Sequence, residues 1–182
     1  MSLDHHLLEN IREIVEKHRI HEVLMNYCRG VDRNDVTIIT ASFHTDAQFE
    51  YAGKTMKGSD SISEFLSRAM TALDIATHMV CNEIIELDGD TASSELYFLS
   101  SCVLPGKAKD ERQLRVRAGR YLDRLERRNG EWKISSRIVV QDWCKLDELH
   151  ELPTSESSFR EGKQGRKDPL YELLATRKIL SA

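Results

Sequence analysis

The chain changes its hydrophobic period once, from a helical repeat near the N-terminus to an alternating repeat afterwards. Apolar residues recur at helical spacing between residues 7 and 31, with a shift of face about halfway. This pattern predicts two consecutive helices, or one bent helix, ending close to Asp32. Asn34 or Asp35 can cap a further short helix that reaches Phe43. Asp32 is therefore expected in a tight corner between helices.

Beyond Asp46, apolar and polar residues alternate, which indicates β-strands. A short strand ending at Tyr51 turns at Gly53 into a hairpin. Longer alternating runs follow, joined by turn-forming segments of which Asn129-Gly130 is the strongest hairpin signal. These long strands are predicted over residues 76–87, 91–104, 112–127 and 131–141. We expect them to form an antiparallel meander.

One helix is expected between the hairpin and the long strands. Ser59 or Ser61 followed by Glu64 fits a capping box, and the apolar spacing continues to Met70. Helices first and a curved antiparallel sheet afterwards describe an α+β cone, in which the sheet wraps around the helices. This order predicts a cone-shaped α+β barrel with an internal apolar pocket.

The C-terminal part of the chain has a different composition. Residues 1–150 are expected to form the one domain, whereas residues 151–182 form a polar tail that ends in a C-terminal helix. The tail is expected to be mobile unless it docks on a partner.

Charge argues against nucleic acid as a partner. The formal net charge of the 182 residues is -4. An arginine-rich strand runs from Arg115 to Arg128, but acidic residues interleave with the arginines and few aromatic residues accompany them. A solvated or subunit-facing sheet surface explains this strand better.

The sequence also favours a soluble protein of a reducing compartment. The four cysteines are widely spaced and show no CxxC pattern, which suits free thiols. Leu7 and Leu8 are followed at once by charged residues, and no apolar run approaches the length that spans a membrane. We therefore expect a cytoplasmic protein without a signal peptide or membrane partner.

Asp32 and His78 are the first candidates for chemistry. A carboxylate at a helix C-terminus is unfavourable by some tenths of a kcal/mol, so Asp32 needs a hydrogen-bonding partner. His78 stands alone in an apolar strand on the same side as Ala76 and Val80, and it is either a core histidine or the partner of Asp32. An aspartate that holds one ring nitrogen leaves the other free to take a proton.

The tyrosines leave two roles open, whereas the histidine spacing and the missing motifs argue against several classes of chemistry. Tyr27, Tyr51 and Tyr97 are either core aromatics or hydrogen-bond donors. His18 and His21 lack a third ligand at metal-binding spacing, so no metal is expected. The chain has no glycine-rich phosphate loop and no GxSxG elbow, which argues against nucleotide cofactors and serine hydrolase chemistry.

Four segments together resemble the SnoaL-like branch of the NTF2-like superfamily. Within this branch the chain is similar to bile acid 7α-dehydratases and hexachlorocyclohexane dehydrochlorinase, and more distantly to scytalone dehydratase. These relatives are cofactor-free eliminases, so the resemblance implies that this chain needs no cofactor. The segments cover residues 27–35, 43–51, 77–79 and 119–134.

The resemblance assigns roles residue by residue. Asp32 and His78 match the Asp-His dyad of the active lyases, and Tyr27 and Tyr51 match the two tyrosines of the bile acid enzyme's pocket. Further substrate-binding candidates are Arg137, Tyr97, Ser100 and Gln141. Arg137 falls where the dehydrochlorinase can have an arginine. Ser100 and Gln141 replace an acidic residue and an arginine of the bile acid dehydratase, so the substrate is expected to differ.

Three functions stay open on the sequence. The favoured one is a dehydratase-type lyase acting on a hydrophobic, cyclic or steroid-like small molecule through the Asp-His dyad. The alternatives are a ketosteroid-isomerase-type proton shuttle and a non-catalytic domain that binds a small ligand or a partner. The relatives' assembly on the outer face of the sheet implies a homo-oligomer, a trimer in preference to a dimer.

Overall fold

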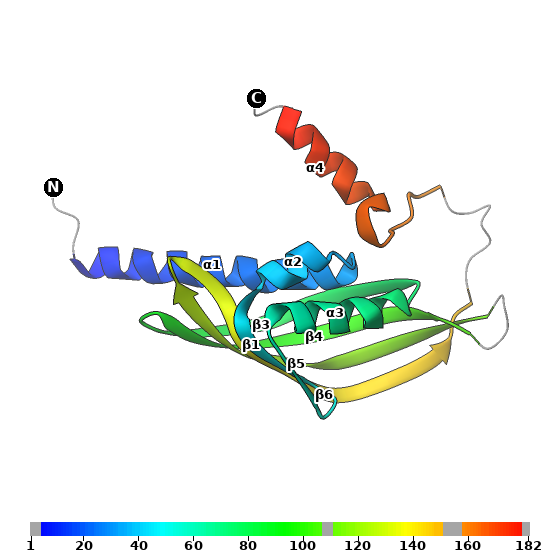
Figure 1. Ribbon diagram of the computed structural model, residues 1–182, viewed down its shortest axis with the longest axis horizontal. Helices are drawn as coiled ribbons and strands as arrows, with labels where there is room; N and C mark the ends of the chain where they lie inside the picture. Colours follow the sequence, from blue (N-terminus) through cyan, green and yellow to red (C-terminus); the bar gives the residue numbers. More distant parts are fainter. Residues whose placement is uncertain (1–4, 107–110, 151–157, 180–182) are drawn as a thin grey trace.

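A six-stranded sheet covered on one face by three helices forms the body of the protein (Figure 1). The computed structural model describes residues 5–106, 111–150 and 158–179. The helices are α1 (His5–Asp32), α2 (Val36–Ala41), α3 (Ser59–Thr71), the 3-10 turn η2 (Gly165–Lys167) and α4 (Pro169–Ile179). The strands are β1 (Phe43–Tyr51), β2 (Lys54–Lys57), β3 (Ile75–Asp88), β4 (Thr91–Pro105), β5 (Arg112–Arg128) and β6 (Glu131–Glu148).

The sheet is curved and open, with the strand order β2-β1-β6-β5-β4-β3. Strands β3 to β6 form the expected antiparallel meander, and the predicted α+β class is confirmed. One pairing was not predicted from the sequence, since β1 pairs with β6 in parallel. This pairing brings the N-terminal hairpin beside the last strand, so the helices lie in the hollow of the sheet.

The first helix is continuous and ends at a defined corner. Asn34 adopts a left-handed φ of 50°, and the Asp35 N–H donates to the carbonyl of Gly30 at 2.8 Å, which closes the helix C-terminus. The Asp35 carboxylate then caps α2 by accepting from the N–H groups of Thr37 and Ile38. Asp32 is thereby fixed in the last turn of α1, within the predicted corner.

The capping box predicted for α3 is absent. Gly58 occupies the N-cap position with a φ of +86°, in the left-handed region that favours glycine. Ser59 and Ser61 already lie inside the helix, and no side chain caps it. The hairpin leads directly into the helix here, since the Gly58 N–H donates to the carbonyl of Ala47.

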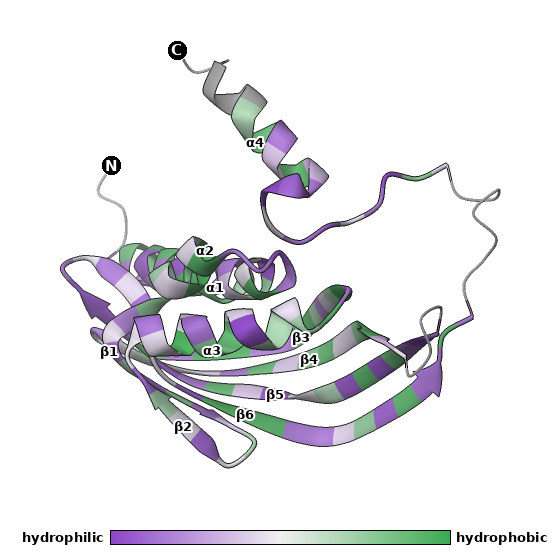
Figure 2. Cartoon of the chain, turned by 45° about the vertical axis from the view of Figure 1, so that its right-hand side comes forward, coloured by the Kyte–Doolittle hydropathy of each residue, from purple (hydrophilic) through white to green (hydrophobic). Residues whose placement is uncertain are grey.

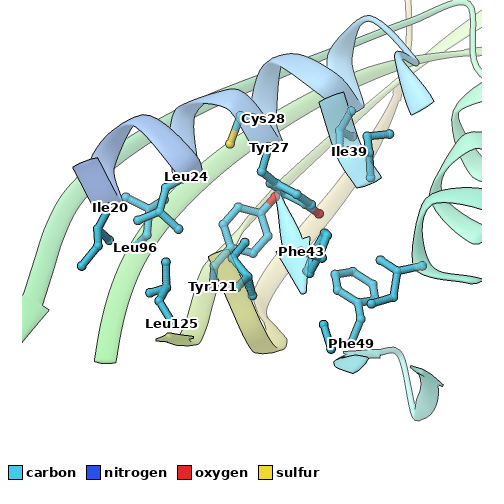
Figure 3. Packing of buried hydrophobic residues seen from close by; sticks show 14 of the residues in the cluster. Ile20, Leu24, Tyr27, Cys28, Ile39, Phe43, Phe49, Leu96, Tyr121 and Leu125 are labelled. Atoms are coloured by element: carbon cyan, nitrogen blue, oxygen red, sulfur yellow. The ribbon is translucent and has the colours of Figure 1, made fainter. Parts of the chain in front are cut away.

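The core lies between the helices and the concave face of the sheet. Figure 3 shows Leu24 and Tyr27 of α1 above Tyr121 and Leu125 of β5. Apolar and polar residues alternate along the long strands, as Figure 2 shows, so one strand face packs on the helices. The N-terminal half of α1 extends past this core and exposes Ile14 and its apolar neighbours.

A bulge at Gly119 shapes the wall formed by β6. Gly119 pairs with Gln141, whereas Ala118 pairs with Trp143, so Asp142 is an extra residue in β6. A side chain at position 119 would bring its Cβ within 2.0 Å of the Val140 carbonyl oxygen. Glycine is therefore required here, and the extra residue puts Trp143 on the opposite face of the sheet from Gln141.

The described part of the tail docks on its own chain. The Gln164 amide donates to the carbonyls of Met70 and Leu73, and the Gly165 N–H donates to the carbonyl of Arg33. Figure 1 shows α4 on the helix side of the sheet. The predicted mobile tail lies outside the described residues between positions 151 and 157. Among the described helices, none combines the length and apolarity needed to cross a membrane.

Candidate active site

A cavity of about 560 Å³ lies between the helices and the sheet. This volume falls in the ordinary range for small-molecule sites. Its walls come from α1, α3, the β1–β2 hairpin and the concave faces of β3 to β6. Apolar and aromatic side chains make up most of the lining. The polar residues of the lining are Tyr27, Glu50, Tyr51, His78, Ser100, Arg115, Arg117, Tyr121 and Gln141.

The structure brings Asp32 and His78 into direct contact. The His78 ring Nδ1 lies 2.6 Å from one carboxylate oxygen of Asp32, and the His78 backbone N–H donates to the other at 3.0 Å. Their side chains are only 10% and 13% exposed. Because an ionised carboxylate can only accept, Nδ1 carries a proton, and in the neutral ring Nε2 is then the unprotonated nitrogen. His78 lines the cavity, whereas Asp32 stands behind it.

Aromatic rings form the wall beside His78. Phe98 packs against the His78 ring at 6.3 Å between centroids and stacks on Tyr121 at 4.5 Å. Tyr27 meets Tyr121 edge to face. Burial raises the pKa of Tyr27 above its ordinary value, although the Arg137 charge partly opposes this. Tyr27 is therefore a neutral phenol at the cavity wall.

Arg137 does not line the cavity, contrary to its expected role in binding substrate. It is fully buried, and two of its nitrogens donate to the two carboxylate oxygens of Asp123, each at 2.6 Å. The guanidinium lies 4.0 Å from the ring centroid of Tyr27 and 4.3 Å from that of Tyr121. Arg137 therefore packs behind the cavity wall, against the rings of Tyr27 and Tyr121.

The remaining predicted residues divide between the two faces of the sheet. Ser100 is buried and lines the cavity, and Gln141 lines it with an exposed side chain. Tyr51 also lines the cavity, and its hydroxyl accepts from Arg117. Tyr97 lies on the opposite face, under Arg120, so a contact with substrate inside this cavity is excluded for it. Strand alternation explains this, since Phe98 points inward.

Sequence reasoning missed Arg115 and Arg117 as cavity residues. It treated the arginines of this strand as one charged outer surface. The alternation of β5 carries a signal that could have separated them, because Arg115 and Arg117 share parity with the buried residues Tyr121 and Leu125. Both arginines therefore face the helices.

No metal centre is found within the described ranges. None of their histidine, cysteine, aspartate and glutamate side chains form a cluster of three or more that could hold an ion. The polar groups of the cavity are suited instead to hydrogen bonding and proton transfer.

Solved structures with the same architecture include a dehydrochlorinase and a provisionally assigned dehydratase. A hexachlorocyclohexane dehydrochlorinase from Novosphingobium barchaimii superposes with a TM-score of 0.69 and 19% identity, covering 79% of this chain and 99% of that chain. A provisionally assigned scytalone dehydratase from Novosphingobium aromaticivorans gives 0.64 and 18%, covering 77% and 91%. At these identities the likeness establishes the fold alone.

Sequence relatives and the family assignment agree with the fold. Uncharacterized proteins from Mycobacterium tuberculosis and Mycobacterium bovis are each 26% identical over 148 residues, which is 79% of this chain and 97% of theirs. Residues 12–138 match the SnoaL-like domain family. The resemblance that the sequence segments carried is thereby confirmed, and the chain belongs to the SnoaL-like domain family.

Proposed function

We propose that the protein is a cofactor-independent lyase that eliminates water, or another small leaving group, from a hydrophobic small molecule. The observation that supports this best is the 2.6 Å contact between His78 Nδ1 and Asp32 at the wall of the cavity. The carboxylate fixes the ring tautomer, so Nε2 is available to take a proton from a bound molecule. The activities named for the two structural relatives are eliminations as well.

These groups can carry out the elimination and return to their starting protonation states. His78 Nε2 removes a proton from a carbon next to an activating group, and the C–H electrons become the new C=C bond. The bond to the departing hydroxyl breaks, and that oxygen takes a proton from Tyr27 or Tyr51 and leaves as water. The imidazolium then returns its proton to the phenolate through water. Proton transfer by such groups contributes on the order of 10²- to 10⁴-fold to the rate.

The isomerase alternative is less well supported because it uses a carboxylate as the base. Both carboxylate oxygens of Asp32 accept from His78, and Asp32 does not line the cavity. A non-catalytic domain that binds a small ligand would use the cavity of about 560 Å³, but it would not need the contact between Asp32 and His78. Both alternatives remain outcomes of the test.

The test is a mass measurement on cyclic β-hydroxy carbonyl compounds incubated with the protein in D₂O. A lyase gives a product lighter by one water, and the His78→Ala variant does not. A product of unchanged mass with deuterium exchanged into it identifies an isomerase. If compounds that bind in the cavity show neither change, the lyase proposal is wrong and the binding-domain alternative replaces it.

A further inference from the structure

Two arginine side chains line the cavity, and the proposed elimination assigns no role to them. They are Arg115 and Arg117, which lie on the concave face of β5 together with Tyr121. Both side chains are partly buried, and the Nε atom of each is buried without a hydrogen-bond partner in the described part of the chain. Buried polar atoms are ordinarily paired, so these two need an explanation.

Other arginines of the same strand are paired with carboxylates. Their partners are Glu95 for Arg120, Asp90 for Arg127 and Asp46 for Arg128. Arg117, in contrast, donates to the hydroxyl of Tyr51. Neither Arg115 nor Arg117 forms an ion pair with a carboxylate of the described residues. Within the described residues, the two inward arginines thus carry positive charge without a carboxylate partner.

The acidic residues near the cavity do not offset this charge. Glu50 contributes to the rim, but it alternates with the inward residues Phe49 and Tyr51 and its side chain is exposed. Asp32 keeps its negative charge, but it is hydrogen-bonded to His78 and does not line the cavity. The positive charge of the cavity wall is therefore concentrated on β5 at Arg115 and Arg117, although the whole chain carries a net charge of -4.

The strand register places this charge at a fixed separation from His78. Ser100 pairs with His78 on one side and with Arg117 on the other, so the three residues form a row across β3, β4 and β5. Two inter-strand steps correspond to roughly 10 Å between the end residues. Arg115 lies two residues beyond Arg117 on the same face.

We propose that the substrate carries a carboxylate, which Arg117 and Arg115 bind while His78 takes a proton from the apolar body of the same molecule. A guanidinium offers paired N–H donors that match the two oxygens of a carboxylate. The anionic group and the reacting carbon then lie at opposite ends of the row through Ser100. This inference rests on the proposed function for the use of the cavity, and it names the substrate class.

Calorimetric titration with 2-naphthoate and 2-naphthamide tests the inference without requiring turnover. The wild-type protein should bind the carboxylate about tenfold more tightly than the amide, since charged hydrogen bonds are involved. Arg115→Gln and Arg117→Gln should each remove most of that preference. Arg124→Gln, an exposed position on the same strand, should retain it. Arg117→Lys, which keeps the charge, should retain part of it and serves if the glutamine variant does not fold.

Equal affinity for the amide and the carboxylate, or glutamine variants that keep the preference, would overturn the proposal. Tighter binding of 2-naphthyl phosphate than of 2-naphthoate would overturn the choice of a carboxylate. The same titration on His78→Ala separates this inference from the proposed function. A preserved carboxylate preference without any His78-dependent turnover supports the anion site and contradicts the lyase.

Discussion

Arg137 is a fully buried charge that is paired with a buried carboxylate, and its Nη1 atom has no hydrogen-bond partner among the described residues. The Asp123 carboxylate accepts hydrogen bonds from two nitrogens of Arg137, and the Ser94 hydroxyl also donates to this carboxylate. Burial lowers the pKa of Arg137, but the negative charge and the hydrogen bonds of Asp123 raise it by more. The pKa of Arg137 therefore lies above its ordinary value. The guanidinium lies between Tyr27 and Tyr121 and holds both rings. Its contribution to the site is positional.

Replacing Arg137 with methionine should lower the free energy of unfolding by about 3–5 kcal/mol, because Asp123 is left charged and unpaired in the core. Urea denaturation measures this loss. Arg124→Met, exposed on the neighbouring strand, should change the stability by less than about 0.5 kcal/mol. The double variant Arg137→Met, Asp123→Leu should recover much of the loss. A loss below about 1 kcal/mol in Arg137→Met would contradict the role assigned to the pair.

Tyr27 and Tyr51 are proposed to share the role of acid toward the leaving group. Each single change to phenylalanine should lower kcat on a hydroxyl substrate by about tenfold, and the double change by on the order of 10²-fold or more. Steady-state kinetics on an authenticated substrate measures both. With chloride in place of the hydroxyl, which leaves without a proton, the double variant should approach the wild-type rate. A double variant with an unchanged rate on the hydroxyl substrate would remove the tyrosines from the mechanism.

At the scale of elements, the C-terminal segment supports the corner that carries Asp32. Asp168 accepts from the N–H groups of Lys163 and Leu170 and lies 3.3 Å from Arg33 Nε. Tyr171 donates to the carboxylate of Asp35, the cap of α2. The segment thus contacts the turn between α1 and α2, directly after the end of the helix that holds Asp32.

The contact of Tyr171 with Asp35 should weaken in alkaline solution. Burial, together with this hydrogen bond, raises the pKa of Tyr171 to about 12 from an ordinary value of 10. Between pH 10 and about 12 the Tyr171 hydroxyl keeps its proton in the folded state and loses it in the unfolded state. The contribution of Tyr171 to the free energy of unfolding therefore falls as the pH rises through this range. The stability difference between wild type and Tyr171→Phe should be constant below pH 10 and shrink above it. A difference that stays flat or grows up to pH 12 would contradict the assignment.

The elements were predictable where the local pattern matched the packing. Asp35 as the cap of α2, the turn at Gly53 and the Asn129-Gly130 hairpin follow from local chemistry, and the structure has them. The β1–β6 pairing was not predictable, because it joins segments that are far apart in the sequence. The predicted capping box does not form, because the N-cap residue is Gly58, whose positive φ is unfavourable for serine.

The candidate site could be assigned in part for the same reasons. Asp32 has a local electrostatic need for a partner, and this need pointed to His78 before any geometry was known. Tyr97, however, was assigned by the type of residue without regard to its strand face. Arg115 and Arg117 were missed because polar residues occupy both faces of this part of β5, which hides the alternation. Their parity with Tyr121 was the one signal that pointed inward, and the structure shows that it holds.

At the scale of the whole molecule, the convex face of the sheet is an apolar surface without a covering layer in the described structure. Alternation and register place on it side chains that are more than a third exposed. They are Ile75, Met79, Ile84, Tyr97, Ile138 and Trp143. Exposed apolar side chains gathered on one face favour association between proteins. We therefore keep the expectation of a homo-oligomer, with a trimer favoured over a dimer.

Trp143→Glu should dissociate that oligomer, because it places a charge within the apolar face. Sedimentation velocity at micromolar concentration should show one oligomeric species for the wild type and a monomer for the variant. Phe159→Glu, on an exposed segment away from the sheet, should leave the oligomer intact. A monomeric wild-type protein under these conditions would contradict the expectation.

The central claim is that Asp32 and His78 act as one unit that removes a proton, and the kinetics of their variants test it most directly. On an authenticated substrate, with folding checked by circular dichroism, His78→Ala should lower kcat by on the order of 10²-fold or more. Asp32→Asn should lose most of the rate as well, and the double variant should be little worse than either, because groups that act together are not additive. If His78→Ala instead turns over at nearly the wild-type rate, the elimination proposed for this cavity is wrong.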